Sequence, residues 1–396
     1  MGKPKIRFKG YTDDWEQRKL GDILERRIEQ RQQSEEYPRL AFASGQGVIP
    51  LSERKTNNRE QLTKDEFTKK YLVTELDDIV YNPANVKYGA IDRNKCGRGL
   101  ISPIYVTFTT SEIPGFIERI VTSYDFQQRA LRFEEGTVTK RQSVNPEDLV
   151  TLDVLLPHQR EEQKKVGAYF DKLDHLITLH QRKCEETKKL KKYMLQKMFP
   201  QDGQVVPEIR FKGFTDAWEQ RKLGNFGKAT GGTSIESEFS EDGIYKVINI
   251  GSYSENSIYN DQGIRAIKSD KTSNRVLNRN DLTMILNDKT TSGNIIGRVL
   301  LIEESGIYVY NQRTERIEID LDEYDPVFLY EMLNAPNIRE KIIKQAQGNT
   351  QIYVNWTAIS LLEYMIPSKE EQAKIGEYLH SISNLITLHQ CKCIEY

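Results

Sequence analysis

The sequence predicts a mixed α/β protein in which two similar globular domains are joined by two long antiparallel helices that pair as a coiled coil. Three observations predict this pseudo-twofold dumbbell. Two sequence blocks, A and B, each occur twice in the order A, insert, B, A, insert, B; the B blocks have helical periodicity; and each insert is the size of a domain. We place the elements, in chain order, at residues 1–157 (domain), 158–200 (central helix), 201–367 (domain) and 368–396 (C-terminal helix).

The A and B blocks form a repeated frame. IRFKGYTDDWEQRKLGDI at residues 6–23 returns as IRFKGFTDAWEQRKLGNF at 209–226, a shift of 203 positions. EEQKKVGAYFDKLDHLITLHQRKC at 161–184 returns as EEQAKIGEYLHSISNLITLHQCKC at 370–393, a shift of 209. Chance does not produce such matches, so the two halves are expected to share one fold.

The inserts, at about 24–156 and 227–366, share little sequence. Three short landmarks correspond: 76–80 with 279–283, 104–106 with 307–309, and Gly136 followed by Val144-Asn145 with Gly348 followed by Val354-Asn355. Near-identical frames around divergent inserts are typical of a scaffold whose fixed parts bind constant partners while its inserts recognise different targets. Gene duplication followed by neutral drift is the competing interpretation, but drift blurs frame and insert alike.

The B blocks predict long helices because apolar residues recur at steps of three and four and no proline occurs from 161 to 198. A helix of ~38 residues is ~57 Å long at 1.5 Å per residue. One such helix cannot bury its apolar stripe alone, so the two are expected to pack on each other in antiparallel directions. The second B block ends at CKCIEY, so the C-terminal helix is expected to be the shorter.

The sequence lacks the patterns that common chemistries need. No G-x-x-x-x-G-K-[ST] phosphate loop occurs, and the four cysteines form no paired CxxC framework. All five histidines lie in or beside the B blocks, which argues against a triad-type hydrolase in either insert. Asn82-Pro83-Ala84-Asn85 departs at its third and fourth residues from the Asn-Pro-Pro-Tyr motif of amino-methyltransferases. We assign no catalytic, cofactor-binding or metal-binding residue.

Composition indicates a water-soluble chain with 29% charged and 37% hydrophobic residues. No apolar run reaches the ~20 residues that span a bilayer, and the first residues contain no signal peptide, so we expect a cytoplasmic protein with no membrane contact. The net charge of −1 does not by itself indicate nucleic-acid binding. Any DNA-binding surface must therefore be local.

The inserts offer basic, amide and aromatic side chains on expected loops, the types that contact phosphates and base edges. The candidates in the first insert are Lys55, Arg59, Asn82, Lys87, Tyr88, Lys140, Arg141 and Gln142. Those in the second are Thr233, Ser234, Asn287, Lys289, Gln312, Arg313, Gln351, Tyr353 and Asn355. For each residue alone, a solvated loop side chain is the competing interpretation.

This layout resembles the specificity subunit of type I restriction-modification systems. The resemblance covers the whole chain and rests on IRFKGYTDDWEQRKLGDI, PHQREEQKKVGAYFDKLDHLITLHQ and LKKYMLQKMFP. It implies a non-catalytic subunit with two target-recognition domains, each binding one half of an asymmetric bipartite site in double-stranded DNA. It also implies two adenine-N6 methyltransferase subunits that bind S-adenosylmethionine, and restriction/translocase subunits that use ATP and Mg²⁺. The short C-terminal helix departs from the family pattern and puts complete partner docking in question.

Two other functions remain open at this point. A self-contained methyltransferase or nuclease predicts activity of the chain alone. A two-headed coiled-coil scaffold that binds proteins predicts no salt-sensitive affinity for DNA, whereas phosphate contacts weaken steeply as salt rises.

Overall fold

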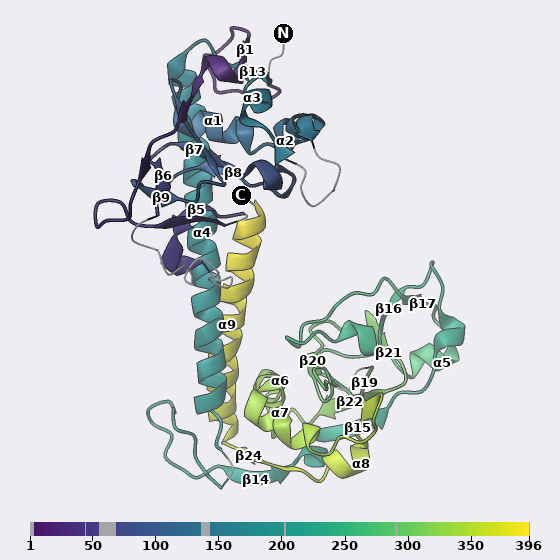
Figure 1. The fold of residues 1–396 in the computed structure, drawn as a ribbon. Coiled ribbons are helices and arrows are strands. Elements are labelled where there is room, and N and C mark those ends of the chain that lie inside the picture. Colours follow the sequence, from purple (N-terminus) through teal and green to yellow (C-terminus); the bar gives the residue numbers. More distant parts are fainter. Residues whose placement is uncertain are drawn as a thin grey trace. The chain divides into compact units, whose positions relative to one another are not determined.

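The computed structural model describes residues 4–43, 45–54, 69–135, 143–201, 203–289 and 292–395 (Figure 1). The chain divides into two units, residues 1–177 and 178–396. The division falls within α4 (Arg160–Lys197), a helix of 38 residues that begins in the first unit and ends in the second. Both units combine sheets with short helices, which confirms the predicted mixed α/β fold class. In the described parts of the chain, no helix is both long and apolar enough to cross a membrane.

The first unit is built on small antiparallel sheets. Its frame strands are β1 (Glu16–Lys19) and β13 (Asp153–Leu156), which pair with each other. The main sheet has the order β2 (Leu24–Arg27), β10 (Val106–Thr110), β7 (Ile79–Tyr81), β8 (Ile91–Arg93). The smaller sheets are β3 (Gln30–Arg31), β6 (Tyr71–Thr74), β9 (Gly99–Ile101); β4 (Leu40–Ala43), β5 (Gly47–Pro50); and β11 (Glu134–Glu135), β12 (Ser143–Val144). The short helices are α1 (Pro114–Val121), α2 (Tyr124–Ala130) and α3 (Pro146–Leu149).

The second unit repeats this plan. Frame strands β14 (Glu219–Lys222) and β24 (Glu363–Ile366) pair with each other. The main sheet has the order β15 (Gly227–Gly231), β22 (Thr314–Ile319), β18 (Leu282–Ile285), β20 (Val299–Leu301). The smaller sheets are β17 (Arg265–Ala266), β16 (Tyr245–Ile248), β21 (Tyr308–Tyr310); and β19 (Asn287–Asp288), β23 (Ile352–Tyr353). The helices are α5 (Asp270–Ser273), α6 (Pro326–Asn334), α7 (Pro336–Ile343), α8 (Trp356–Ile359) and α9 (Lys369–Glu395).

One buried ion pair shows that the divergent inserts keep a common fold. Asp78 accepts two hydrogen bonds from Arg27 on β2, at 2.8 and 3.0 Å. Asp281, 203 positions later, accepts two from Arg316 on β22, at 2.8 and 3.2 Å. Arg27 lies opposite Thr107, and Arg316 lies opposite Thr230, so arginine and threonine have exchanged places across the strand pair. The ion pair between this aspartate and an arginine is therefore present in both units, although the strand that supplies the arginine differs.

Two of the three predicted landmarks agree with the structure and one is wrong. Residues 76–80 and 279–283 do correspond, since Asp77 and Asn280 share a left-handed backbone, with φ of 71° and 74°. Asn145 and Asn355 both precede a short helix. Residues 104–106 do not correspond to 307–309, because Val106 begins β10 whereas Val309 lies on β21.

The cause of the misalignment is a longer connection in the second unit. Tyr81 pairs with Ile91 and Met284 pairs with Val299, so nine intervening residues (82–90) become fourteen (285–298). Strand pairing gives the correct match: Val106 pairs with Tyr81 and Glu315 pairs with Met284, so Val106 corresponds to Glu315.

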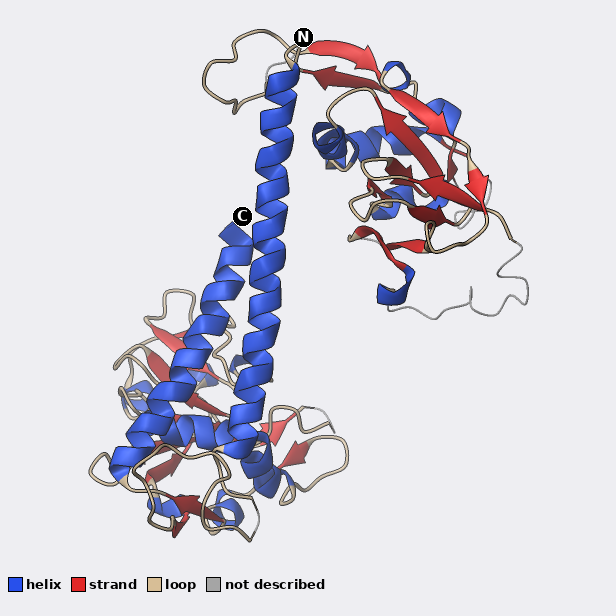
Figure 2. Ribbon diagram, turned by 90° about the vertical axis from the view of Figure 1, so that its left-hand side faces the viewer, coloured by secondary structure: helices blue, strands red, loops and turns tan. Residues whose placement is uncertain are grey.

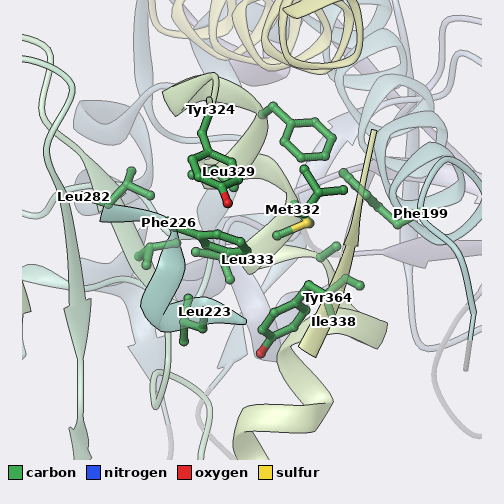
Figure 3. Packing of buried hydrophobic residues seen from close by; sticks show 14 of the residues in the cluster. Phe199, Leu223, Phe226, Leu282, Tyr324, Leu329, Met332, Leu333, Ile338 and Tyr364 are labelled. Atoms are coloured by element: carbon green, nitrogen blue, oxygen red, sulfur yellow. The ribbon is translucent and has the colours of Figure 1, made fainter. Parts of the chain in front are cut away.

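The frame is part of the core of the second unit. The largest buried cluster combines Phe199 after α4, Trp218, Leu223 and Phe226 of the A block, and Leu379 of α9. Figure 3 shows Phe199, Leu223 and Phe226 around Met332 and Leu333 of α6. Insert residues from α6 thus pack directly on frame residues.

The frame makes the same polar contacts in both units. Glu162 accepts from Arg7 at 2.6 and 2.8 Å, and Glu371 accepts from Arg210 at 2.7 and 2.7 Å. Gln163 accepts from the Ile113 amide, and Gln372 accepts from the Asp325 amide. Each glutamine therefore holds the residue just before an insert helix, α1 in the first unit and α6 in the second.

A glycine lets that insert helix approach closely in each unit. A Cβ atom at Gly167 would lie 3.0 Å from the Phe116 nitrogen, and one at Gly376 would lie 2.9 Å from the Phe328 nitrogen. These glycines are therefore required by the backbone contact, although glycine weakens an isolated helix.

Within the second unit, α9 packs antiparallel on the C-terminal part of α4, as predicted (Figures 1 and 2). His180 Nδ1 lies 3.1 Å from His389 Nδ1, and further along α4 Lys191 Nζ lies 2.7 Å from Ser383 Oγ. Residue numbers thus rise on one helix as they fall on the other. The histidines lie in the helix seam, and Lys191 also pairs with buried Glu331 at 2.9 Å.

Candidate nucleic-acid interface

Each unit has a surface hollow at an equivalent place. Two of the segments that line it match between the units: one follows β7 or β18, and the other directly precedes β10 or β22. A third segment also matches. Leu100 and Val309 are equivalent because each lies six residues before the matched Val106 and Glu315. Arg39 bridges Leu100 and Val247 pairs with Val309, both in parallel, so three residues further on Phe42 of the first hollow corresponds to Ile250 of the second. The two hollows are therefore copies of one site on one fold.

The first hollow, of about 420 Å³, is aromatic and amide in character. It is lined by Phe42, Asn82, Asn85, Tyr88, Ala90 and Tyr105. The Phe42 and Tyr105 rings stack at 5.9 Å, while Tyr88 is 65% exposed. Asn82 has a local role as well, because its side-chain oxygen caps the 3₁₀ helix Pro83–Tyr88 by accepting from the Ala84 amide at 3.1 Å. Flat rings and amides suit base edges and base faces.

The second hollow, of about 360 Å³, is polar and carries cations. Its lining comes from five stretches of the chain: Glu236 and Phe239; Asn249, Ile250 and Gly251; Gln262 and Ile264; Lys289; and Asn311, Gln312 and Arg313. Three predicted residues, Lys289, Gln312 and Arg313, thus meet at one place. Gln312 donates to Glu236 at 3.2 Å, which fixes its amide at the wall.

Arg313 has an unusual backbone conformation. Its φ of 71° is left-handed, which is rare for a residue with a side chain and is typical of constrained functional sites. The buried Asn287 amide, in the orientation that satisfies both of its ends, accepts from Arg313 Nη1 at 2.8 Å and donates to the Leu286 carbonyl at 3.3 Å. Asn287 is therefore a support for Arg313 and does not itself line the hollow.

The structure places several other predicted residues away from the hollows, and some lie outside the described residues. Thr233 accepts from Arg275 at 2.8 Å, and Ser234 accepts from the Glu236 amide. Tyr353 pairs with Asn287 on the β19–β23 ribbon, Gln351 is exposed just before it, and Asn355 precedes α8. Lys55, Arg59, Lys140, Arg141 and Gln142 lie outside the described residues, and Lys87 lies in the 3₁₀ helix Pro83–Tyr88.

Several lining residues escaped prediction. Phe42, Tyr105, Asn249 and Gln262 come from strands and turns far from the candidate loops in sequence. Only the strand order brings them to the hollows, and no local pattern distinguishes them from core or surface residues.

A buried carboxyl lies two residues beyond Arg313. Glu315 on β22 is 6% exposed, and its burial raises its pKa to about 7, an effect that Arg275 opposes in part. Its counterpart in the first unit is Val106, so the carboxyl is specific to the second unit.

Glu315 predicts a pH-dependent loss of stability. In the unfolded chain a Glu carboxyl titrates near ~4.3, so the folded state keeps the proton between that value and about 7. The contribution is full below the unfolded pKa and is lost as pH rises through about 7. We expect Glu315→Gln to gain stability over the wild type on going from pH 5 to pH 8, measured by urea unfolding. Glu318→Gln, exposed on the same strand, is the control, and parallel pH profiles for Glu315→Gln and wild type would disprove the assignment.

The described residues do not form a metal-binding cluster at the hollows. Among the residues that the structure describes, no group of three His, Cys, Asp or Glu side chains is placed to hold a metal ion. The arrangement provides donors, acceptors and rings on one surface of each unit, which is suited to recognition.

Comparison with known proteins shows which proteins this chain is similar to. Residues 215–395 match the family model of the type I restriction modification DNA specificity domain. The type I restriction enzyme MjaVIII specificity subunit of Methanocaldococcus jannaschii is 27% identical over 236 residues, which is 58% of this chain and 55% of that protein. The chain therefore spans about half the length of this curated relative.

Solved structures agree in fold. The crystal structure of the type I restriction-modification system S subunit from M. genitalium superposes with a TM-score of 0.64 at 13% identity, over 99% of this chain and 95% of that one. A chain from a study of complex assembly and conformational transition of the type I R-M system gives 0.50 at 14% identity, over 97% and 94%. The resemblance to type I specificity subunits that the sequence predicted is confirmed.

Proposed function

We propose that this chain is the DNA-reading specificity subunit of a type I restriction-modification complex and performs no chemistry itself. The first unit reads one half of an asymmetric bipartite site in double-stranded DNA, and the second unit reads the other. The observation that carries the proposal is the pair of hollows, which occupy equivalent places on one fold but present different side chains. Two copies of one reader with different lining residues are suited to two different half-sites.

The repeated frame supports the partner side of the proposal. Because Arg7–Glu162 and Arg210–Glu371 recur with the same geometry, the two units offer like surfaces around the B blocks. Two identical methyltransferase subunits are the partners that such a repeat fits. In this proposal S-adenosylmethionine, ATP and Mg²⁺ bind to the methyltransferase and restriction/translocase subunits, and the paired helices set the spacing between half-sites.

The test is to co-express the chain with the methyltransferase subunit of its own genome and to map N6-methyladenine across the host DNA. We expect one split motif, methylated on both strands. A soluble complex that methylates no such motif contradicts the proposal.

A binding measurement separates the proposal from a protein-binding scaffold. The complex is expected to bind duplex DNA with an affinity that falls steeply as salt rises from 50 to 200 mM, since phosphate contacts release counterions. Binding that is absent, or that is insensitive to salt, favours the scaffold.

A further inference from the structure

We infer that the turn before β10 in the first unit, and before β22 in the second, reads one base of each half-site, with Arg313 recognising a guanine and Ile104 the methyl group of a thymine. This inference deepens the proposed function and rests on it. It names the specificity-determining residue in each unit and the class of base that each one reads.

Strand pairing shows that the two residues are equivalent. Val106 opposite Tyr81 corresponds to Glu315 opposite Met284, so the residues two positions earlier, Ile104 and Arg313, also correspond. Each lies in the turn that enters the second strand of the main sheet. The first turn is closed by the Tyr105 amide, which donates to the Ser102 carbonyl at 3.0 Å, and the second is tied to the Leu286 amide through the Arg313 carbonyl at 2.9 Å.

Both side chains are presented to the outside from a rigid base. Ile104 is 62% exposed, and Arg313 is exposed at the rim of the second hollow. The neighbouring residues in each turn are fixed: Tyr105 stacks on Phe42, and Asn311 accepts from the Ile235 amide at 3.1 Å. A side chain held on a fixed turn loses little freedom on binding, which favours specific contact.

The chemistry of Arg313 points to guanine. Asn287 engages Nη1 on one side of the guanidinium, which orients the planar fork. An arginine fork pairs with guanine O6 and N7 in the major groove, the commonest specific contact between a side chain and a base. The left-handed backbone at Arg313 raises the free energy locally, and the surrounding structure offsets this strain. Such strain is expected where the position of a side chain is important for function.

Ile104 offers no hydrogen bond, so it selects by shape. Ile104 directly precedes Tyr105, which lines the first hollow, and its exposed apolar side chain can contact the C5 methyl group of thymine, whereas the other bases offer it no favourable partner. The same turn thus reads a hydrogen-bonding edge in one unit and a methyl group in the other.

The test compares methylation motifs of the complete complex with single substitutions. Arg313→Ile places the residue of the first turn in the second unit, and Ile104→Arg makes the reciprocal change. Lys344→Ala, an exposed cation on the segment after α7, is the control. We expect Arg313→Ile to lose the preference for one guanine in one half-site, by roughly ten- to a hundredfold, while the other half is unchanged. Ile104→Arg is expected to change one thymine in the opposite half.

Folding is checked separately, by thermal unfolding and by assembly with the methyltransferase. Arg313→Lys keeps the charge but loses the fork, so it is expected to relax the same guanine by a smaller factor. The inference is overturned if Arg313→Ile and Arg313→Lys methylate the wild-type motif without relaxation, or if they weaken all positions of both halves equally. A wild-type complex that yields no split motif instead defeats the proposed function, and is distinguishable because it does not involve the variants.

Discussion

Replacing Arg210 by methionine is expected to lower the free energy of unfolding of the second unit by about 3–5 kcal/mol. The side chain of Glu371 is 1% exposed, and Arg210 provides two hydrogen bonds to it at 2.7 Å. Methionine keeps most of the packing volume but leaves the Glu371 carboxylate buried without its partner. The penalty comes from that uncompensated charge more than from the lost attraction.

Urea unfolding monitored by tryptophan fluorescence measures this effect, since Trp218 lies in the core of the second unit. The matched control is Arg221→Met, which breaks the exposed pair with Glu219 and is expected to have little effect. In the double variant Arg210→Met/Glu371→Leu, much of the lost stability is expected to return, because no charge remains buried. Equal unfolding curves for Arg210→Met and Arg221→Met would refute the role of burial.

The frame could be predicted from the sequence because its constraints are local and repeated. The helix expected from 161 to 198 is Arg160–Lys197, and its antiparallel partner is Lys369–Glu395. Periodicity and the absence of proline determine such a helix within the chain itself. The His180–His389 contact could be predicted only as a seam position, since the register between two helices depends on how they pack.

The inserts were less predictable because their contacts are not local. Lys289, Gln312 and Arg313 were chosen as loop residues of a suitable type, and the structure brings them together. Phe42 and Gln262 line the hollows through strand order alone, and the longer connection after β18 misled the alignment of Ile104. The type of residue therefore indicated which side chains could contact DNA. Which residues of the two units are equivalent could be found only from the strand register.

Replacing residues 227–366 by a copy of residues 24–156 is expected to give a protein that reads the same half-site twice. The frame contacts permit this exchange. Gln372 and Gly376 hold the start of α6 as Gln163 and Gly167 hold the start of α1, so the start of the transplanted α1 finds the same contacts. The charged contacts do not match. Arg93 donates to Asp171 at 2.6 Å and Arg119 donates to Asp174 at 2.5 Å, but the second B block has His380 and Ser383 at these places. Pro114 and Pro326 both begin the insert helix, so Arg119 also corresponds to Glu331.

These mismatches have a predictable cost and a remedy. In the native second unit Lys191 pairs with Glu331, which is buried, whereas the transplanted helix would place an arginine opposite Lys191. Two like charges there disfavour docking, so the transplanted copy needs glutamate at the position of Arg119. It also needs aspartate in place of His380, because Arg93 pairs with Asp171 in the first unit. With these changes the complex is expected to methylate a symmetric split motif whose two halves both equal the half-site of the first unit. Methylation of the original asymmetric motif by the transplanted protein would mean that sequence is not read by the inserts, and a folded, assembled complex with no motif would mean that the inserts depend on more of their own frame than these contacts.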